Sequence, residues 1–410
     1  MSKPATSLRK SKACALLFED IHQRASQLLK QAGFKVKCLP ATLNEAGLAK
    51  RLSGVTILGI RSKTKVGQAV LSKAGDLLAL GAFCVGTNQI DLDSASERGV
   101  VVFNAPFSNT RSVVELAAGE IIMLMRRVFD VSSKLHKGRW SKSSAGCFEV
   151  RGKKLGIIGY GNIGAQLSVL AEALGMEVYY YDSIERLALG NARKTHSLPE
   201  LLQMADVVSV HVDGRRANVN LIDEAEFRLM KQGAFFLNLS RGSVVNLKAL
   251  AGNLRNGHIA GAAVDVYPYE PEGNNQKFSC ELAGLPNVIL TPHIGGNTME
   301  AQKNSAEYVT ARLVDYINSG KTVGSVNFPE LDLPGLKQAH RLLHIHHNVP
   351  GILAKINGIL AEERINILGQ YLKTNDKIGY VITDVDRKYD RSVIEKLRSV
   401  PETIRFRVLY

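Results

Sequence analysis

The chain has 410 residues, 45% of them hydrophobic and 22% charged, which is the balance of an ordinary globular protein with two or three domains. Its five cysteines are odd in number and form no Cys-x-x-Cys pair, which argues against a disulfide framework or a zinc site and favours the cytoplasm. The net charge of +14 comes from scattered lysines and arginines, and no apolar run reaches membrane-spanning length, so we expect neither nucleic acid nor a membrane as a partner. A basic surface would instead attract an anionic small molecule.

The first hundred residues alternate short apolar strands with amphipathic helices. Residues 1–12 are basic and rich in serine, and we expect a disordered tail there. The next predicted elements are a helix over Ile21–Ala32 and strands over Ala15–Phe18, Val36–Leu39, Val55–Arg61, Leu77–Phe83 and Val100–Phe103. This alternation predicts an α/β domain. A capping box, Ser112 with Glu115, then predicts the start of a long apolar helix that ends near Phe129.

The segment that begins at Lys154 carries the strongest local signal. An apolar strand runs into Gly159-Tyr160-Gly161-Asn162-Ile163-Gly164, a helix follows, and a second strand, Glu177–Tyr181, ends at Asp182. A glycine motif between strand and helix, with an acidic residue about 20 positions further on, is the dinucleotide-binding fingerprint. The pattern predicts a Rossmann domain.

Each part of this fingerprint has a physical role. Gly159 permits the tight turn, Gly161 lets the backbone approach a pyrophosphate, and Gly164 packs the helix against the strand. The N-terminus of the helix offers free N–H groups to the phosphates. Asp182 can accept hydrogen bonds from a ribose diol and would repel a 2′-phosphate, so we expect NAD rather than NADP.

The middle of the chain continues the βα alternation, which predicts a doubly wound parallel sheet. Further strands are predicted near Val207–Val212, Phe235–Leu239, Ala262–Val266 and Val288–Leu290, followed by a helix over Thr298–Asn318. The glycine motif arrives only after a complete α/β unit, so this helix is expected to return to the first domain. We therefore expect a discontinuous first domain, 13–108 with 297–330, and a cofactor domain over 109–296.

The last 70 residues, after an expected linker over 331–340, follow a different order. Strands are predicted over Arg341–His346, Ile367–Thr374, Gly379–Asp384 and Ile404–Val408, with helices over Gly351–Glu362 and Arg391–Ser399. The order βαββαβ predicts a small ferredoxin-like domain over 341–410. The run His344-x-His346-His347 invites a metal site, but strand side chains alternate faces and no acidic or cysteine residue adjoins the run, so we expect no metal.

Three ionisable residues, Arg241, Glu270 and His293, follow three successive strands of the cofactor domain. Because ligands of an open parallel sheet bind beyond the carboxyl ends of its strands, these side chains should converge where the nicotinamide would lie. Arg241 can hold a carboxylate through its planar fork. His293 can take a hydroxyl proton, and Glu270 can hold the imidazole and raise its pKa. The set fits the oxidation of a 2-hydroxy acid.

The strings around these residues resemble the D-isomer-specific 2-hydroxyacid dehydrogenases. They are Ser240-Arg241-Gly242, Asp265-Val266-Tyr267-Pro268-Tyr269-Glu270-Pro271 and Thr291-Pro292-His293-Ile294-Gly295-Gly296. The segment from Phe103 to Val113 and the C-terminal domain narrow the resemblance, over about residues 13–410, to bacterial-type members with an ACT domain, the family's amino-acid sensor. The resemblance implies two doubly wound parallel-sheet domains, a flavodoxin-like substrate domain and a Rossmann NAD domain, followed by a ferredoxin-like ACT domain. It also implies oxidation of 3-phospho-D-glycerate to 3-phosphohydroxypyruvate, the first step of phosphorylated serine biosynthesis.

The resemblance assigns roles residue by residue. It makes catalytic residues of Arg241, Glu270 and His293. The positions that match the NAD site are Gly159, Gly161, Asn162, Ile163, Gly164, Asp182, Leu239, Ser240, Asp265, Gly295 and Gly296, with Asp265 expected to bond the carboxamide. The positions that match the substrate site are Arg61, Lys63, Asn109 and Lys142.

Regulation and assembly are also implied by the resemblance. The effector positions are His346, Asn348 and Asn366, where L-serine is expected to bind across a pair of ACT domains. The single tryptophan, Trp140, falls in a segment that resembles the family's subunit contact, which implies a homo-oligomer, a tetramer in our expectation. Its alternative is an ordinary core or surface aromatic.

Three departures from the family pattern stand out. Lys63 stands where members of the family usually have arginine, so we expect weaker binding of the substrate phosphate. The run His211-Val212-Asp213-Gly214-Arg215-Arg216 departs from the His-Val-Pro that usually lines the adenine. Lys337-Gln338-Ala339 stands where serine-sensitive members carry a Gly-Gly pair, which leaves serine inhibition open.

Alternatives to phosphoglycerate oxidation remain open at this point. Another D-2-hydroxy acid, such as 2-hydroxyglutarate, would also suit the basic pair Arg61 and Lys63. An NAD-sensing corepressor on the same fold is disfavoured by the ACT domain, and a catalytically inactive amino-acid sensor by the complete set Arg241, Glu270 and His293.

Overall fold

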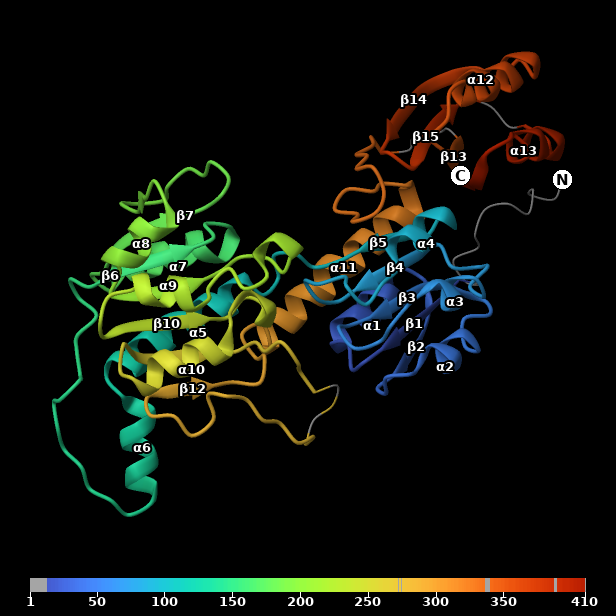
Figure 1. The fold of residues 1–410 in the computed structure, drawn as a ribbon. Coiled ribbons are helices and arrows are strands. Elements are labelled where there is room, and N and C mark those ends of the chain that lie inside the picture. Colours follow the sequence, from blue (N-terminus) through green and yellow to red (C-terminus); the bar gives the residue numbers. More distant parts are fainter. Residues whose placement is uncertain (1–12, 272, 274, 336–339, 387–388, 410) are drawn as a thin grey trace. The chain divides into compact units, whose positions relative to one another are not determined.

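The computed structural model describes residues 13–271, 273, 275–335, 340–386 and 389–409. The tail expected over 1–12 and the linker positions 336–339, which include Lys337, Gln338 and Ala339, lie outside the described residues. The chain divides into two compact units, Met1–Ser108 with Gln302–Tyr410, and Asn109–Ala301. Each unit contains a parallel sheet covered by helices (Figure 1).

The first unit contains a five-stranded parallel sheet in the order β2-β1-β3-β4-β5, which is the flavodoxin-like order. Its strands are β1 (Cys14–Phe18), β2 (Lys35–Leu39), β3 (Val55–Ile60), β4 (Ala79–Ala82) and β5 (Val101–Phe103). Its helices are α1 (Gln23–Gln31), α2 (Glu45–Ala49), α3 (Gln68–Leu71), α4 (Leu92–Glu97) and α11 (Met299–Ser319). Helix α11 returns from the far part of the chain and crosses β4 closely, because a Cβ on Gly81 would stand 2.7 Å from Val309.

The C-terminal part of the first unit is a four-stranded antiparallel sheet in the order β14-β15-β13-β16. Its elements are β13 (His340–His347), α12 (Ile352–Glu362), β14 (Ile367–Thr374), β15 (Ile378–Val385), α13 (Arg391–Arg398) and β16 (Thr403–Leu409). Side chains at alternate positions serve two cores. Leu342 and Val381 pack with α12 and α13, whereas Leu343 and Tyr380 share a core with Leu313 of α11. Strands β13 and β15 of the ferredoxin-like sheet are therefore buried on both faces.

Arg341 joins this sheet to the end of α11. Its side chain is fully buried, and its Nε and Nη2 atoms each lie 2.7 Å from a carboxylate oxygen of Asp384 on β15. Its Nη1 atom donates to the carbonyl oxygen of Ser319 at 3.0 Å, and Nη2 also donates to that of Pro334 at 3.2 Å. A buried guanidinium is tolerated because each of its three nitrogen atoms donates to an acceptor, two of them to a carboxylate.

The second unit contains a seven-stranded parallel sheet in the order β12-β11-β10-β9-β6-β7-β8. Reversed, this is the Rossmann order with one added edge strand. The strands are β6 (Lys154–Ile158), β7 (Glu177–Tyr181), β8 (Arg193–Lys194), β9 (Val207–Val210), β10 (Ala234–Asn238), β11 (Ile259–Val264) and β12 (Val288–Leu290). The helices are α5 (Thr110–Met125), α6 (Val128–His136), α7 (Asn162–Ala173), α8 (Leu198–Met204), α9 (Glu224–Leu229) and α10 (Leu247–Arg255), with short turns η2 (Arg216–Asn218) and η3 (Gly242–Val244).

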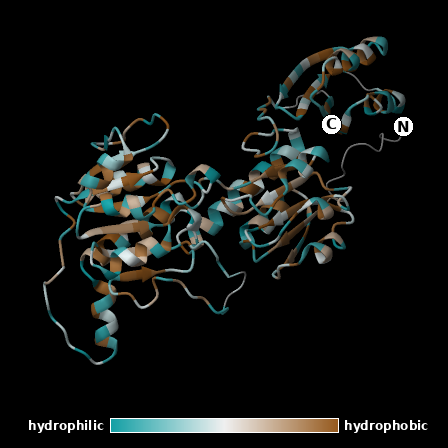
Figure 2. Ribbon diagram, viewed as in Figure 1, coloured by the Kyte–Doolittle hydropathy of each residue, from teal (hydrophilic) through white to brown (hydrophobic). Residues whose placement is uncertain are grey.

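The predicted fold class is confirmed by these three sheets. Figure 2 shows the reason, since the sheet strands are largely apolar while the covering helices alternate apolar and polar residues. In the described part of the chain, no helix combines the length and apolar character that a membrane crossing would need.

The predicted capping box at Ser112 is wrong. The N-cap of helix α5 is Asn109, three residues earlier, and the Ser112 hydroxyl lies 2.8 Å from the Thr298 hydroxyl instead of capping the helix. The predicted continuation to Phe129 is broken at Arg127, whose φ of 51° is left-handed, and α6 starts there as a separate helix. Tertiary contacts of Ser112 thus outweigh the local capping pattern.

Glu120 of α5 is a carboxyl group inside the core of the second unit. Its residue is fully buried, and in the described part of the chain neither carboxyl oxygen has a hydrogen-bond partner. Burial, with the charge of Asp265 adding to it, raises the pKa of Glu120 to about 8. The folded protein therefore holds a proton on Glu120 at neutral pH that the unfolded chain releases.

This linkage makes stability depend on pH. Between about pH 4.5 and about pH 8 the folded state binds more protons than the unfolded state at this site, so stability should fall with rising pH, by at most about 1.4 kcal/mol per pH unit. Glu120→Gln removes the proton exchange and keeps the shape. The melting temperature of this variant, relative to that of wild type, should increase as the pH rises from about 4.5 to about 8. Glu115→Gln, on the exposed side of α5, is the control and should show no such trend.

Candidate active site

The three residues Arg241, Glu270 and His293 lie at the carboxyl ends of three adjacent strands, β10, β11 and β12. The Nδ1 atom of His293 lies 2.7 Å from Glu270 Oε2, and the backbone N–H of Tyr267 donates to Glu270 Oε1 at 3.1 Å. Both carboxylate oxygens are thus engaged. Because the carboxylate only accepts, His293 donates from Nδ1, which leaves Nε2 as the ring atom able to take a proton.

The backbone of His293 is held in an unfavourable conformation. Its φ of 54° is left-handed, which a residue with a Cβ rarely adopts. The His293 N–H donates to the Asp265 carbonyl at 2.8 Å, and the next two N–H groups, of Ile294 and Gly295, donate to the Asp265 carboxylate, both at 2.8 Å. The hydroxyl of Thr291 donates to the same carboxylate at 2.6 Å. These bonds stabilise a conformation that would otherwise be strained.

The charges of the site are mutually dependent. The hydrogen bond to Glu270 raises the pKa of His293 above its ordinary value, against the opposing effect of burial. Burial alone would raise the pKa of Glu270, but the hydrogen bonds from His293 and Tyr267 hold it below its ordinary value. The positive charge of Arg241 acts on both groups. The structure therefore brings all three residues into one electrostatic cluster.

Glycine is required where the ends of β10 and β11 meet. A Cβ on Gly242, the residue after Arg241, would stand 1.9 Å from the carbonyl carbon of Tyr267. The Arg241 guanidinium donates to the Ser240 carbonyl at 2.7 Å, and the Ser240 hydroxyl donates to Asn238 at 2.8 Å. Leu239 and Ser240, both expected at the cofactor, are buried in this junction.

The glycine motif forms the turn that the sequence predicts. Gly159 has φ 91°, and a Cβ there would stand 2.7 Å from the His211 carbonyl oxygen. A Cβ on Gly164 would stand 2.2 Å from the Gly159 carbonyl oxygen, so helix and turn are in direct contact. A Cβ on Gly161 would meet nothing within 4 Å, and Asn162 begins α7 directly after it. An open glycine before a helix N-terminus fits a pyrophosphate.

Asp182 stands at the end of β7 with a fixed carboxylate. It accepts the Tyr160 N–H at 2.8 Å on Oδ2 and the Ile184 N–H at 2.9 Å on Oδ1. Arg186, which the sequence reasoning missed, places its Nε 3.9 Å from Oδ2. Arg215 is held within its own loop by Asp213 at 2.8 Å. Asp182 is fixed as an acceptor, with a cation beside it.

The remaining cofactor and substrate positions fall in several places. Ile163 packs against the core of the second unit, and Gly295 and Gly296 follow His293, where a Cβ on Gly296 would stand 2.2 Å from the Asn109 amide nitrogen. Lys142 is exposed on the irregular segment between α6 and β6. Arg61 and Lys63 belong to the first unit, on the loop after β3.

The effector positions do not meet within one chain. His346 is buried at the end of β13, with Nδ1 2.7 Å from the His347 carbonyl oxygen, and Asn348 donates from its amide to the Asn375 carbonyl at 2.9 Å. Asn366 precedes β14 at the opposite end of the sheet, where Ile367 pairs with Val385. At about 3.4 Å per strand residue the two ends lie roughly 20 Å apart.

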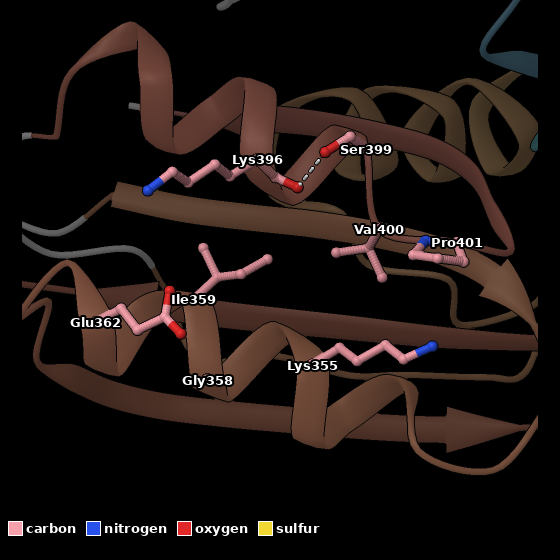
Figure 3. Close-up of a pocket in the computed structure, with 8 residues that line it drawn as sticks. All are labelled: Lys355, Gly358, Ile359, Glu362, Lys396, Ser399, Val400 and Pro401. Carbon is pink, nitrogen blue, oxygen red and sulfur yellow. Dashed lines mark hydrogen bonds between the residues drawn. The ribbon is translucent and has the colours of Figure 1, made fainter.

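A groove of about 410 Å³ lies between α12 and α13, outside these positions (Figure 3). Lys355 and Lys396 line it, but their ammonium groups point in opposite directions, and Glu362 adds a negative charge. The groove therefore presents no converging site for an anion.

Comparisons with known proteins agree with this geometry. Residues 118–295 match the model of the D-isomer specific 2-hydroxyacid dehydrogenase NAD binding domain, and residues 342–405 match an AHAS small subunit-like ACT domain. The D-3-phosphoglycerate dehydrogenase of Dictyostelium discoideum is 50% identical over 407 residues, covering 99% of this chain and 100% of that protein. The Escherichia coli K12 enzyme of the same name is 47% identical over 407 residues, covering 98% and 99%.

Solved structures show the same fold. A D-2-hydroxyisocaproate dehydrogenase covers 77% of this chain and 99% of its own, with TM-score 0.70 and 27% identity. A D-lactate dehydrogenase from Aquifex aeolicus, complexed with NAD and lactic acid, covers 77% and 100%, with TM-score 0.65 and 26% identity. The chain belongs to the D-isomer-specific 2-hydroxyacid dehydrogenase family of oxidoreductases. Its near-full-length relatives are D-3-phosphoglycerate dehydrogenases, and the middle of the chain carries the family's NAD binding domain.

Replacing Glu270 by Gln tests the His293–Glu270 pair. Without the carboxylate the His293 pKa should fall, so the acid limb of kcat/KM for hydroxyl oxidation should move to lower pH, because neutral imidazole persists further into acid. The rate at the optimum should drop about 10²-fold, since the imidazolium formed in the reaction loses its partner. Glu281→Gln, an exposed carboxyl of the same unit, is the control. A profile with an unmoved acid limb would contradict the pairing.

Proposed function

We propose that this protein is an NAD-dependent dehydrogenase that oxidises the 2-hydroxyl of 3-phospho-D-glycerate to 3-phosphohydroxypyruvate, the first step of phosphorylated serine biosynthesis. The observation that carries the proposal is the 2.7 Å contact between His293 and Glu270, beside Arg241, at the carboxyl edge of a Rossmann sheet. The near-full-length relatives named for this reaction support the choice of substrate.

The residues divide the chemistry among them. His293 Nε2 takes the hydroxyl proton as the C2 hydrogen leaves as hydride, and Glu270 stabilises the imidazolium that forms. Arg241 holds the substrate carboxylate or the developing carbonyl oxygen through its planar guanidinium. Bound NAD supplies the hydride acceptor at its nicotinamide ring. Asp265 is the proposed partner of the carboxamide.

NAD is the proposed cofactor rather than NADP. Asp182 is held in place by two backbone N–H groups and would oppose a 2′-phosphate. Arg186, at 3.9 Å, offsets part of that charge, whereas Arg215 is already paired with Asp213. We expect kcat/KM with NAD to exceed kcat/KM with NADP. Neutralising Asp182 should reduce the ratio of the two values.

The substrate phosphate is assigned to Arg61 and Lys63, with Asn109 and Lys142 as the further substrate contacts. A second carboxylate would satisfy the same cations, so 2-hydroxyglutarate is the alternative substrate to exclude. The cytoplasm is the proposed compartment, on the cysteine pattern of the sequence alone.

A panel of substrates tests this proposal. We expect NADH formation with 3-phospho-D-glycerate to exceed that with D-2-hydroxyglutarate, D-lactate and D-glycerate, and to exceed NADPH formation from NADP. His293→Gln should lower kcat by about 10²–10⁴-fold, because the proton acceptor is lost, while the KM for NAD stays near wild type. His258→Gln, in the same unit, is the matched control. A His293 variant that retains a tenth of wild-type kcat would exclude this residue as the base.

Self-association is proposed from an exposed apolar surface on the second unit. No residue of α6 is buried, and Phe129, Leu135 and Trp140 are 54%, 56% and 82% exposed. Such a surface is typical of a protein contact. We propose that a second copy covers it, within a homotetramer, and that Lys142, on the same exposed segment, meets substrate across that contact.

The ACT domain is proposed to bind L-serine between two copies. Asn366 lies far from His346 and Asn348 in one chain, so a two-fold pairing along the exposed edge strand β14 would bring one set from each copy together. Leu368 and Leu372 of β14 are 57% and 43% exposed, which suits such an edge contact.

Calorimetry tests the effector proposal. L-serine should bind the intact protein, and Asn348→Ala should weaken binding about tenfold or more because a hydrogen bond to the effector is lost. Lys355→Ala, in the groove between α12 and α13, is the control and should bind as wild type does. Wild-type protein that shows no heat with L-serine would rule out serine as the effector.

A further inference from the structure

A buried carboxylate in the first unit holds the loop that carries Arg61 and Lys63. Glu19, directly after β1, is 8% exposed. Its Oε1 accepts the backbone N–H groups of Arg61 at 3.1 Å and Thr64 at 2.7 Å, and its Oε2 accepts the N–H of Lys63 at 3.0 Å. One side chain therefore receives three of the four N–H groups between residues 61 and 64.

The backbone at Glu19 is unusual. Glu19 has φ 61° and Asp20 has φ 48°, so two consecutive residues with side chains are left-handed. Such conformations persist only where surrounding bonds determine them, and they cluster at functional sites. The three hydrogen bonds of Glu19 supply that constraint. The carboxylate is thus held toward the loop after β3 by its own strained backbone.

The same loop is held from its other side. The side-chain amide of Gln89 donates to the Arg61 carbonyl at 2.7 Å. The peptide groups of Arg61 are therefore bonded at both N–H and C=O. Within the described residues, neither the Arg61 guanidinium nor the Lys63 ammonium forms an ion pair with a carboxylate, although their backbone is fixed. A rigid backbone with two unpaired cations fits a preformed site for an anion.

We propose that Glu19 is a positioning residue for the substrate: its carboxylate fixes the backbone from which Arg61 and Lys63 bind the phosphate of 3-phospho-D-glycerate. This inference rests on the proposed function, because it takes the Arg61–Thr64 loop to be the phosphate-binding loop. Glu19 itself touches no substrate atom and acts through the loop alone.

Only a carboxylate can satisfy this arrangement. Ionised Glu accepts on both oxygens, whereas Gln accepts on one and donates on the other. In Glu19→Gln the amide nitrogen would face a backbone N–H, so at least one of the three bonds is lost and two donors oppose each other. The loop should then sample other conformations, and the cations should be less well placed.

Steady-state kinetics of Glu19→Gln tests the proposal. The KM for 3-phospho-D-glycerate should rise about tenfold, which corresponds to the loss of about one hydrogen bond to a charged group, while the KM for NAD and kcat stay within about threefold of wild type. Glu45→Gln is the matched control, because the exposed Glu45 carboxylate accepts a single N–H, from Gly67 at 2.9 Å, in the segment just beyond the loop. Its KM should equal that of wild type.

Coupling to the loop separates a positioning role from a general structural one. In an Arg61→Ala, Lys63→Ala background the additional Glu19→Gln change should leave KM unaltered, because the cations that it positions are gone. Amide hydrogen exchange of Arg61, Lys63 and Thr64 should be faster in Glu19→Gln, with Gly67 unchanged, a readout that needs only folded protein. Asp20→Gly relieves the strain of one left-handed residue and leaves the Glu19 carboxylate in place. This variant should therefore retain the wild-type KM.

The outcomes distinguish this inference from the function on which it rests. Wild-type protein that does not turn over 3-phospho-D-glycerate would refute the proposed function. The KM of Glu19→Gln and of wild type would then be compared for the acid that the protein does oxidise, and that comparison would test the positioning role of Glu19. If Arg61→Ala raises KM but Glu19→Gln does not, the positioning role is refuted and the function stands. Equal KM effects of Glu19→Gln with and without Arg61 and Lys63 would likewise refute it.

Discussion

The hydrogen bonds of Asp265 are the constraint on which the rest of the site depends. This residue is 1% exposed and joins the end of β11 to the loop after β12. Its carbonyl oxygen accepts the N–H of His293. Its carboxylate accepts hydrogen bonds from the Thr291 hydroxyl and from the N–H groups of Ile294 and Gly295. The left-handed conformation of His293, and with it the approach to Glu270, follows from these bonds. Losing them would free the imidazole from its partner even if both side chains remained present.

The same device recurs at two other strand ends. Asp182, after β7, accepts the N–H of Tyr160 in the glycine turn after β6, and Glu19, after β1, accepts three N–H groups of the loop after β3. In each case a carboxylate at the end of one parallel strand holds the loop that follows its neighbour. Loops at the carboxyl edge of a parallel sheet lack the ladder bonds of the strands, so carboxylates at neighbouring strand ends supply the missing acceptors. Binding and catalytic loops thereby gain the order of the sheet beneath them.

Two fully buried ionisable side chains, Glu120 and Arg341, have different surroundings. The carboxyl oxygens of Glu120 have no hydrogen-bond partner in the described part of the chain, and burial, with the negative charge of Asp265 adding to it, raises the pKa of this group. Arg341 in the ACT domain is as deeply buried, but the Asp384 carboxylate and two carbonyl oxygens accept hydrogen bonds from its guanidinium. The two residues differ in pairing rather than in depth, and a buried charge without a partner is the costly case.

The sequence by itself determined the fold class, the family and the location of the glycine turn, because each rests on local periodicity or on contiguous motifs such as the one from Gly159 to Gly164. The strand ends after β10, β11 and β12 could be aligned in advance, so the grouping of Arg241, Glu270 and His293 was predictable from the parallel order of the sheet, while their catalytic roles remain a prediction.

Only the tertiary structure decided the rest. It showed that Ser112 contacts Thr298 instead of capping α5, that Glu120 is buried, that Asn366 lies at the opposite end of the sheet from His346, and that Glu19 holds the Arg61–Thr64 loop. These features depend on contacts between residues far apart in the sequence, such as Glu19 and Arg61, 42 positions apart, or Ser112 and Thr298, 186 positions apart. No local pattern encodes which distant group a side chain will meet.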